Sequence, residues 1–496
     1  MSKLQTGLAL CFSGLFFIIS LLFIHPAEDA VILYEYSNTL ANTGVISYGN
    51  IGTPIEGATD FLWMVAISLF HLVGINEYTA SLMISSLSLY LLIKLLCKHN
   101  HLFFILIAMT ITSFIYSAAF GFSSIVFSTI YLYCLQFYLQ KKHKNMHLCI
   151  LLLCLFRPDG VVWGASLVLL YQFKNRFSLS KERLLVSLKY LIIPGGVYFL
   201  WRMYYFNELL PLPFYIKQHG IKELLLFSYS SLKDVAIVAI PMLIVISMSK
   251  NKATIILITI IPILFYSSMT LSQNIGNRFI APLFFGVLYL LNKEGNIKKY
   301  IYVLFVSILS AAITHRVINQ IIYSKNENIF ALSKNLNGIN GRMLVTESGR
   351  LAYYSDWTVH DSWGLNTPQF SKKLIQPIDI KNGNYDLIVS HCYMDKIKNS
   401  IQEKRSWNNQ CTNILIAIKE MNYNMYLVPF YTNSGSLLYK FKQLISPPKT
   451  NCNRYDIYSI NPRSEKHQAI KTVLLQHQAI TYNDTLNFKD GDTLCF

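Results

Sequence analysis

Long apolar runs alternate with short polar loops through the first 319 residues, and this pattern predicts a bundle of membrane-spanning helices. The first run, residues 5–24, is uninterrupted and matches the ~20 residues that one bilayer crossing needs. Its length would also suit a signal peptide, but no small-x-small cleavage site follows cleanly, so we expect a retained span. Ten further runs follow, at residues 78–97, 101–119, 122–140, 147–157, 160–172, 185–206, 229–249, 253–271, 278–292 and 299–318.

These runs predict about eleven spans, which puts the two ends of the membrane part on opposite sides. Runs 147–157 and 160–172 are short and could instead be partial helices that meet at a polar turn, which would change the count. Loops rich in Lys and Arg test the arrangement, because such loops stay in the cytoplasm. Five of them fall on the same side as residue 1, around residues 94–98, 141–144, 174–183, 250–252 and 293–299.

Two regions break the pattern of spans. Residues 25–60 are polar and rich in Gly, and they predict an ordered outer loop, which an interfacial helix of about 15 residues at 61–75 follows. From residue 320 to residue 496 the chain turns polar. Short β-prone runs at 342–345, 385–389 and 414–418 lie between helix-like stretches there, which predicts a small α/β domain on the outer side.

Composition agrees with a polytopic α-helical membrane protein that carries a C-terminal α/β domain. Hydrophobic residues make up 53% of the 496 residues and charged residues 14%. The net charge of +17 would by itself suggest nucleic acid, but the placement of the basic loops explains much of it, so we expect no nucleic-acid partner. Four of the nine cysteines lie in the polar tail and permit two disulfides in an oxidising compartment, namely Cys392, Cys411, Cys452 and Cys495. Their spacing matches no zinc framework.

Two adjacent carboxylates, Glu28 and Asp29, come just after the first span. Ionisable groups near a membrane are costly, so a functional site is the default interpretation. The alternative is that they end a membrane helix in the headgroup zone.

Four basic residues fall at outer ends of spans, against the positive-inside trend: Arg157, Arg202, Lys217 and Arg278. A phosphate group would suit them, because Arg offers it bidentate hydrogen bonds and Lys a point charge. Each could instead contact lipid headgroups or form a structural ion pair, for example Arg157 with Asp159. An acidic pair on the same side makes the set typical of a site for an anionic lipid whose reacting end meets a carboxylate.

Several motifs, taken in chain order, resemble those of lipid-linked arabinofuranosyltransferases. These are membrane glycosyltransferases of the GT-C type, distantly similar to aminoarabinose transferases and protein O-mannosyltransferases. The motifs lie at residues 28–32, 44–46, 55–63, 157–160, 209–217 and 278–282, and more weakly at 351–355 and 361–365. The chain departs from the family pattern in having Glu28 where Asp is usual, Glu35 and Asn38 where Arg is usual, and Asp60 where Asn is usual.

The resemblance implies many transmembrane helices, a polyprenyl-phosphate sugar as donor and an acceptor hydroxyl on the outer face. A carboxylate can take the proton of that hydroxyl, which is worth ~10²–10⁴-fold in rate, and cations can stabilise the phosphate that leaves. We expect Asp29 to be the general base with Glu28 beside it, although the roles could be reversed. Further substrate-binding candidates are Tyr34, Glu56, Asp60, Trp63, Tyr215 and His219.

The sequence thus predicts a multi-pass protein of a bacterial inner membrane with a periplasmic C-terminal domain. It would move one sugar to a glycan or lipid of the cell envelope, in contact with membrane lipids. An oligosaccharide ligase or protein O-glycosyltransferase is the alternative within the enzymes, and a lipid or polysaccharide transporter is the alternative outside them. If a divalent metal such as Mg²⁺ or Mn²⁺ assists, Glu28 and Asp29 are its candidate ligands.

Overall fold

Two compact units make up the chain. A computed structural model describes residues 2–97, 106, 114–174, 181–216, 235, 252–269, 274–293, 328–392, 398, 400–429 and 455–482. The helical unit comprises Met1–Pro26, Asp60–Asn207 and His219–Ile321. The sheet unit comprises Ala27–Thr59, Glu208–Gln218 and Ile322–Phe496. We predicted a single division between residues 319 and 320, whereas two earlier segments also group with the C-terminal part.

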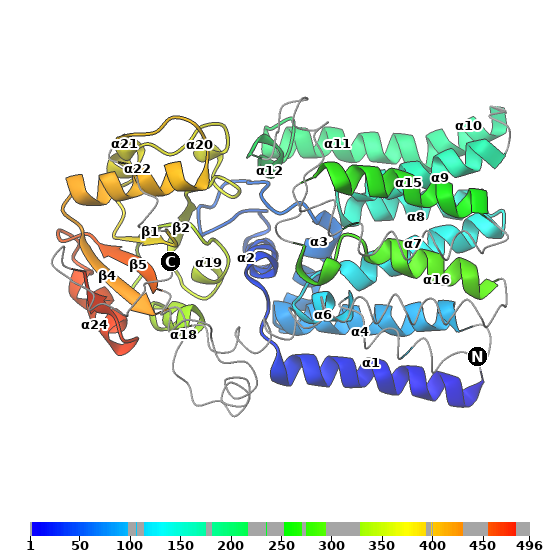
Figure 1. Cartoon of the computed structure of the whole chain (residues 1–496), viewed down its shortest axis with the longest axis horizontal. Helices are drawn as coiled ribbons and strands as arrows, with labels where there is room; N and C mark the ends of the chain where they lie inside the picture. Colours follow the sequence, from blue (N-terminus) through cyan, green and yellow to red (C-terminus); the bar gives the residue numbers. More distant parts are fainter. Residues whose placement is uncertain are drawn as a thin grey trace. The chain divides into compact units, whose positions relative to one another are not determined.

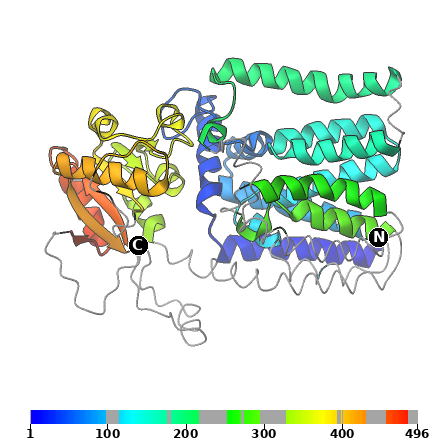
Figure 2. The same cartoon turned by 45° about the horizontal axis from the view of Figure 1, so that its top comes forward.

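The helical unit consists of helices that run alongside one another (Figures 1 and 2). Its long elements are α1 (Lys3–Phe23), α4 (Glu77–Leu96), α7 (Ser124–Leu139), α8 (His143–Phe156), α9 (Gly160–Lys174), α11 (Ile193–Phe206), α15 (Lys252–Ser268) and α16 (Ala281–Lys293). Its shorter elements are α3 (Phe61–His71), α6 (Phe114–Ala119), α10 (Lys181–Ser187), a π-helix (Leu188–Ile192) and the 3₁₀ turn η2 (Ile275–Asn277).

Among the described residues, three helical stretches are long and apolar enough to cross a membrane: Lys3–Phe23, Glu77–Leu96 and Lys181–Phe206. Local signals set their ends. The Ser2 hydroxyl accepts a hydrogen bond from the backbone N–H of Gln5, and the Asn76 side chain accepts one from Thr79, so both helices begin at a side-chain cap. Of the spans predicted at 229–249 and 299–318, the described residues include only residue 235.

Polar and small residues join these helices. The Tyr78 hydroxyl on α4 lies within hydrogen-bond distance of the carbonyl oxygens of Ser20, Ile24 and Ala119, at 3.2, 3.0 and 2.9 Å. A Cβ at Gly286 on α16 would lie 2.9 Å from the Tyr131 ring on α7, so glycine permits this close approach.

The sheet unit contains a six-stranded mixed sheet in the order β2-β1-β3-β5-β4-β6. The strands are β1 (Arg342–Val345), β2 (Thr358–Asp361), β3 (Leu387–Ser390), β4 (Asn424–Pro429), β5 (Tyr455–Ile460) and β6 (Ile480–Thr481). Strand β1 pairs in parallel with both β2 and β3, and the remaining pairs are antiparallel. The helices of this unit are α2 (Glu28–Thr43), α12 (Leu212–Ile216), α18 (Asn328–Asn335), α19 (Arg350–Tyr353), α20 (Pro368–Ser371), α21 (Pro377–Gly383), α22 (Trp407–Glu420) and α24 (His467–Gln476).

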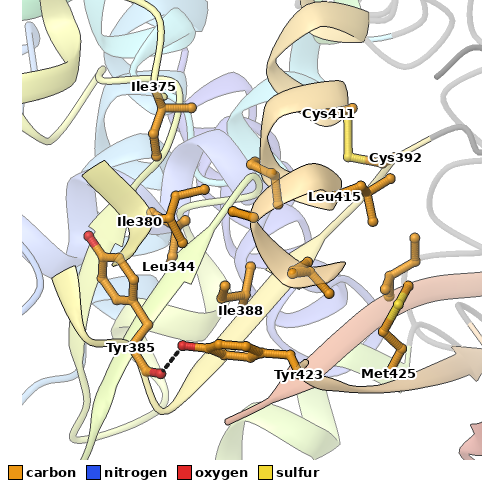
Figure 3. Packing of buried hydrophobic residues seen from close by; sticks show 14 of the residues in the cluster. Leu344, Ile375, Ile380, Tyr385, Ile388, Cys392, Cys411, Leu415, Tyr423 and Met425 are labelled. Atoms are coloured by element: carbon orange, nitrogen blue, oxygen red, sulfur yellow. Dashed lines mark hydrogen bonds between the residues drawn. A yellow bond between two sulfur atoms is a disulfide. The ribbon is translucent and has the colours of Figure 1, made fainter. Parts of the chain in front are cut away.

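An apolar cluster of described residues lies between the sheet and α22 (Figure 3). The Cys392–Cys411 disulfide joins the end of β3 to α22 at its edge, and the Tyr423 hydroxyl donates a 2.6 Å hydrogen bond to the Tyr385 carbonyl. This disulfide is one of the pairings that the tail cysteines permit. Cys452 and Cys495 lie outside the described residues.

Two secondary-structure predictions were wrong. Residues 25–60 are not all loop, because Glu28–Thr43 forms helix α2, with two acids in its first turn and the left-handed Gly44 (φ +72°) after its end. Residues 414–418 are not a strand but part of α22, which begins at the Ser406 cap and buries Ile414 and Ile418, one turn apart. The strands predicted at 342–345 and 385–389 correspond to β1 and β3.

Candidate functional site

The carboxylate of Glu28 is bound to the start of helix α19. Its Oε1 accepts hydrogen bonds from the backbone N–H groups of Gly349 and Arg350, at 2.6 and 3.0 Å. Its Oε2 lies 3.5 Å from Nε of Arg350. Burial raises the pKa of Glu28, while the Arg350 guanidinium and the two N–H groups oppose that rise.

This contact needs glycine at position 349. A Cβ there would lie 2.9 Å from Cδ of Glu28, closer than real Cβ contacts come. Asp29 follows on the same helical turn and is half-buried. The carboxylate of Glu28 is therefore committed to the backbone of the sheet unit.

Tyrosines and one glutamate tie the rest of residues 27–59 to the same unit. The Tyr36 hydroxyl donates to Oδ1 of Asn366 (3.1 Å) and accepts from the backbone N–H of Gly57 (3.0 Å). The Tyr48 hydroxyl donates to the carbonyl of Ser348 at 2.5 Å. Glu35 is buried, and its Oε1 accepts a hydrogen bond from the Gly49 N–H at 3.1 Å. The segment predicted as an outer loop is thus anchored through buried polar contacts.

Ser348, Gly349 and Arg350 follow the carboxyl end of β1, and Asn366 follows that of β2. Ligands commonly bind at this edge of α/β sheets. Asp361 ends β2 and accepts hydrogen bonds from the backbone N–H groups of Trp363 and Asn366, both at 2.9 Å. Burial raises the pKa of Asp361 from 3.8 to about 6. Its bonds are local, so Asp361 shapes the turn after β2.

A second polar cluster lies in the helical unit, around the turn between α8 and α9. Arg157 forms a bidentate pair with Asp159, from Nε to Oδ1 at 3.0 Å and from Nη2 to Oδ2 at 2.7 Å. The Tyr266 hydroxyl on α15 donates to Oδ2 of Asp159 at 2.5 Å and accepts from Nε1 of Trp163 at 3.0 Å. The structural ion pair that the sequence left open for Arg157 is therefore present.

Arg278 belongs to the same cluster. Its Cζ lies 3.8 Å from the ring centroid of Phe122 and 5.0 Å from that of Phe279, and Cζ of Arg157 lies 5.0 Å from the same Phe279 ring. A tight turn presents these residues, with Gly276 at φ +62° and the Phe279 N–H donating to Oδ1 of Asn274 at 3.3 Å. Two guanidinium groups thus share one aromatic ring.

Asp60 completes the cluster from the start of α3. Its Oδ2 accepts a 3.0 Å hydrogen bond from the Ser123 hydroxyl. Burial raises the pKa of Asp60 and the neighbouring Asp159 adds to the rise, while Arg157 and Arg278 oppose it. The helical unit therefore gathers two guanidinium groups and two carboxylates from three separate turns, so the carboxylates already balance part of the positive charge.

The other predicted residues are distributed as follows. Arg202 is buried on α11, whose Tyr198 and Trp201 rings contact the Phe61 ring at 5.0 and 5.5 Å. Trp63 is buried, and its Nε1 donates to the Gly121 carbonyl at 3.4 Å. In the sheet unit, Tyr34 is buried against the Tyr353 ring, Glu56 is buried, and Tyr215 lies beneath Nζ of Lys372. Lys217 and His219 lie outside the described residues.

Sequence reasoning missed several members of both clusters. The backbone N–H groups of Gly349 and Arg350, which bind Glu28, were not among the predicted site residues. Tyr266 lies in an apolar run and Ser123 at a helix start, and neither position carries a local signal of its own.

The surroundings of the Glu28 carboxylate bear on its predicted role as a metal ligand. Oε1 of Glu28 faces two N–H groups, whose partial positive charge disfavours a cation at that oxygen. Among the described residues, no group of three or more His, Cys, Asp or Glu side chains could hold a metal ion. Glu28 is therefore a poor fit as a ligand for Mg²⁺ or Mn²⁺.

Comparisons with known proteins bear on the fold of this chain. A family described as "Domain of unknown function (DUF8728)" matches residues 320–431. No curated protein matches the chain. The crystal structure of ArnT from Cupriavidus metallidurans in the apo state is similar, with a TM-score of 0.53 and 14% sequence identity over 77% of this chain and 92% of that one. The likeness supports a GT-C fold for the chain.

Proposed function

We propose that the protein is a GT-C type glycosyltransferase that takes a sugar from a polyprenyl-phosphate donor. The observation that carries this proposal is the fold shared with ArnT, a GT-C aminoarabinose transferase, over most of both chains. The acceptor is a hydroxyl group on a glycan or lipid of the cell envelope. The protein resides in a bacterial inner membrane, with its sheet unit in the periplasm.

Asp29 is the general base of this proposal. Its neighbour Glu28 is held by two N–H groups and by Arg350, so Glu28 is a positioning residue that fixes the first turn of α2. Asp29 takes the proton of the acceptor hydroxyl as the new C–O bond forms and the bond from the sugar to the phosphate breaks. From the sequence we expected Asp29 as the base and left the reversed roles open, and this proposal keeps Asp29.

Arg278 and Arg157 bind the donor phosphate in this proposal. Their guanidinium groups share the Phe279 ring, and the burial of Arg157 and partial burial of Arg278 strengthen their attraction for the anionic phosphodiester of the donor. The pair with Asp159 uses Nε and Nη2 of Arg157 and leaves its Nη1 outside the pair. As the phosphate leaves, its growing negative charge is stabilised by these groups.

The disulfide supports a periplasmic sheet unit. Disulfides form and persist in oxidising compartments and are rare in the cytosol. Cys392 and Cys411 are both buried and joined, so the unit is expected to fold where thiols are oxidised.

The test compares envelope glycans of the source strain, of a deletion strain, and of the deletion strain complemented with wild type or Asp29→Asn. Mass spectrometry should show the loss of one defined sugar mass on deletion, its return with wild type and its absence with Asp29→Asn. Immunoblots of membranes control for insertion. Accumulation of an intact repeat unit on deletion would indicate a ligase or transporter instead. Transfer retained by Asp29→Asn would refute the assigned base.

A further inference from the structure

Basic and aromatic side chains converge where α8 begins and α10 passes into the π-helix. This end of the helical unit is also where α1 begins (Figure 1). His147 on α8 is buried and joins the two elements, because its Nδ1 lies 2.8 Å from the His143 carbonyl and its Nε2 lies 2.9 Å from the Ser187 hydroxyl. A carbonyl only accepts, so Nδ1 carries the proton and Nε2 accepts from Ser187. The two helix ends are thus fixed against each other.

Pairs of basic side chains meet on shared rings at this junction. Nζ of Lys144 and Nζ of Lys189 lie 5.1 and 5.6 Å from the ring centroid of Tyr190. The ring of His143 and the guanidinium of Arg183 both approach Tyr171, at 4.7 and 6.0 Å.

Lys144 and Lys189 concentrate positive charge around one half-buried ring. Like charges repel, so an anion that contacts both lysines would be stabilised there. Residues 141–147 and 181–190 contain six Lys and Arg residues and one acid, Glu182. Lys144 and Lys189 are exposed, so the positive charge of this junction faces its surroundings.

Apolar side chains continue from this basic end along both helices. Leu148 and Leu152 on α8 are 37% and 44% exposed, and the π-helix ends beyond Lys189 in Ile192, which is 54% exposed. Cations at one end and exposed aliphatic side chains beyond them match the two halves of an anionic phospholipid.

We infer that the junction of α8, α10 and the π-helix binds the headgroup of an anionic phospholipid, with Lys144 and Lys189 on its phosphate and its acyl chains along the adjoining apolar faces. This site is separate from the residues assigned to sugar transfer, so either proposal can fail without the other. A free phosphate would satisfy the same cations but would gain nothing from the apolar faces.

The experiment uses the purified full chain in detergent and native mass spectrometry. The probes are dioleoyl phosphatidylglycerol, dioleoyl phosphatidylcholine with the same acyl chains, and inorganic phosphate. The test variant combines Lys144→Gln with Lys189→Gln. The matched control combines Lys3→Gln with Lys94→Gln, two exposed lysines at the ends of α1 and α4, and removes the same net charge.

Wild type should retain phosphatidylglycerol in preference to phosphatidylcholine. The test variant should bind it roughly 25-fold more weakly, at about fivefold for each lysine, and the control should stay within about threefold of wild type. Lys144→Arg with Lys189→Arg should bind as wild type does. Equal retention of both lipids, equal losses in test and control variants, or displacement of the lipid by ~10 mM inorganic phosphate would each overturn the inference.

Discussion

Replacing each acid of the Glu28–Asp29 pair by its amide separates positioning from chemistry. Glu28→Gln and Asp29→Asn make the same chemical change at adjacent positions. Glu28 accepts two backbone hydrogen bonds at 2.6 and 3.0 Å, and a hydrogen bond to a charged group contributes about 1 kcal/mol more than a neutral one. Glu28→Gln should therefore destabilise the contact with α19 by up to about 2 kcal/mol. This is an upper value, because burial raises the pKa of Glu28 and so favours its neutral form.

Asp29→Asn should have the opposite profile. A first-turn acid contributes about 0.3–1 kcal/mol through the helix dipole, so the stability loss stays below about 1 kcal/mol. Loss of a general base lowers the transfer rate by ~10²–10⁴-fold. Glu28→Gln should lower transfer far less, because the carboxylate of Asp29 remains.

Two measurements on the same membranes distinguish the variants. Hydrogen exchange of the peptide covering residues 347–354 reports the contact with α19, and mass spectrometry of envelope glycans reports transfer. We expect faster exchange with residual transfer in Glu28→Gln, and unchanged exchange without transfer in Asp29→Asn. If Glu28→Gln abolishes transfer while exchange of 347–354 is unchanged, Glu28 is the chemical group and the assignment is wrong.

Further predictions concern three other places in the chain. Arg278→Gln should lower transfer by ~10²–10³-fold and Arg278→Lys by less, because lysine keeps the charge but loses the bidentate geometry; transfer assays at saturating donor check this. The folded protein keeps a proton on Asp361 up to about pH 6, whereas the unfolded chain loses it near 3.8, so stability should fall by up to about 3 kcal/mol as pH rises from 4 to 6. Asp361→Asn should remove this slope in urea unfolding of the full chain followed by near-UV circular dichroism, and an unchanged slope would contradict the raised pKa. Replacing Cys392 and Cys411 by serine should destabilise the sheet unit by about 3 kcal/mol, as a lower urea midpoint, since the disulfide closes a loop with a sequence separation of 19; an unchanged midpoint would show that the disulfide contributes nothing.

Within the described residues, hydropathy predicted several helices of the helical unit, because burial in lipid demands long apolar runs whatever their neighbours are. The runs at 5–24 and 78–97 correspond to α1 and α4 within one or two residues. Strands β1 and β3 were also predictable, since each is a short β-branched or aliphatic run that ends in a turn. The strand prediction at 414–418 was wrong because five apolar or small residues suit a strand and a buried helix equally. The preceding Ser406 cap would have decided for the helix.

The site was only partly predictable. Arg157 and Arg278 are 121 positions apart, and their shared contact with Phe279 depends on how α8, α9 and the turn at 274–279 pack. The ion pair between Arg157 and Asp159 could be predicted, because the two residues are only two positions apart in the sequence. The binding of Glu28 to Gly349 spans 321 positions, and no local pattern near residue 28 signals it. Long-range polar contacts of this kind require the fold.

The sheet unit is assembled from three stretches of chain that are far apart in the sequence. A fragment beginning at residue 322 would lack helix α2 and the tyrosines that fill buried positions against the turns after β1 and β2. Such a fragment should expose unsatisfied polar groups and aggregate. Recombination that exchanges the C-terminal region between related proteins would succeed only if Ala27–Thr59 were exchanged with it, so the acidic motif and the sheet are expected to be inherited together.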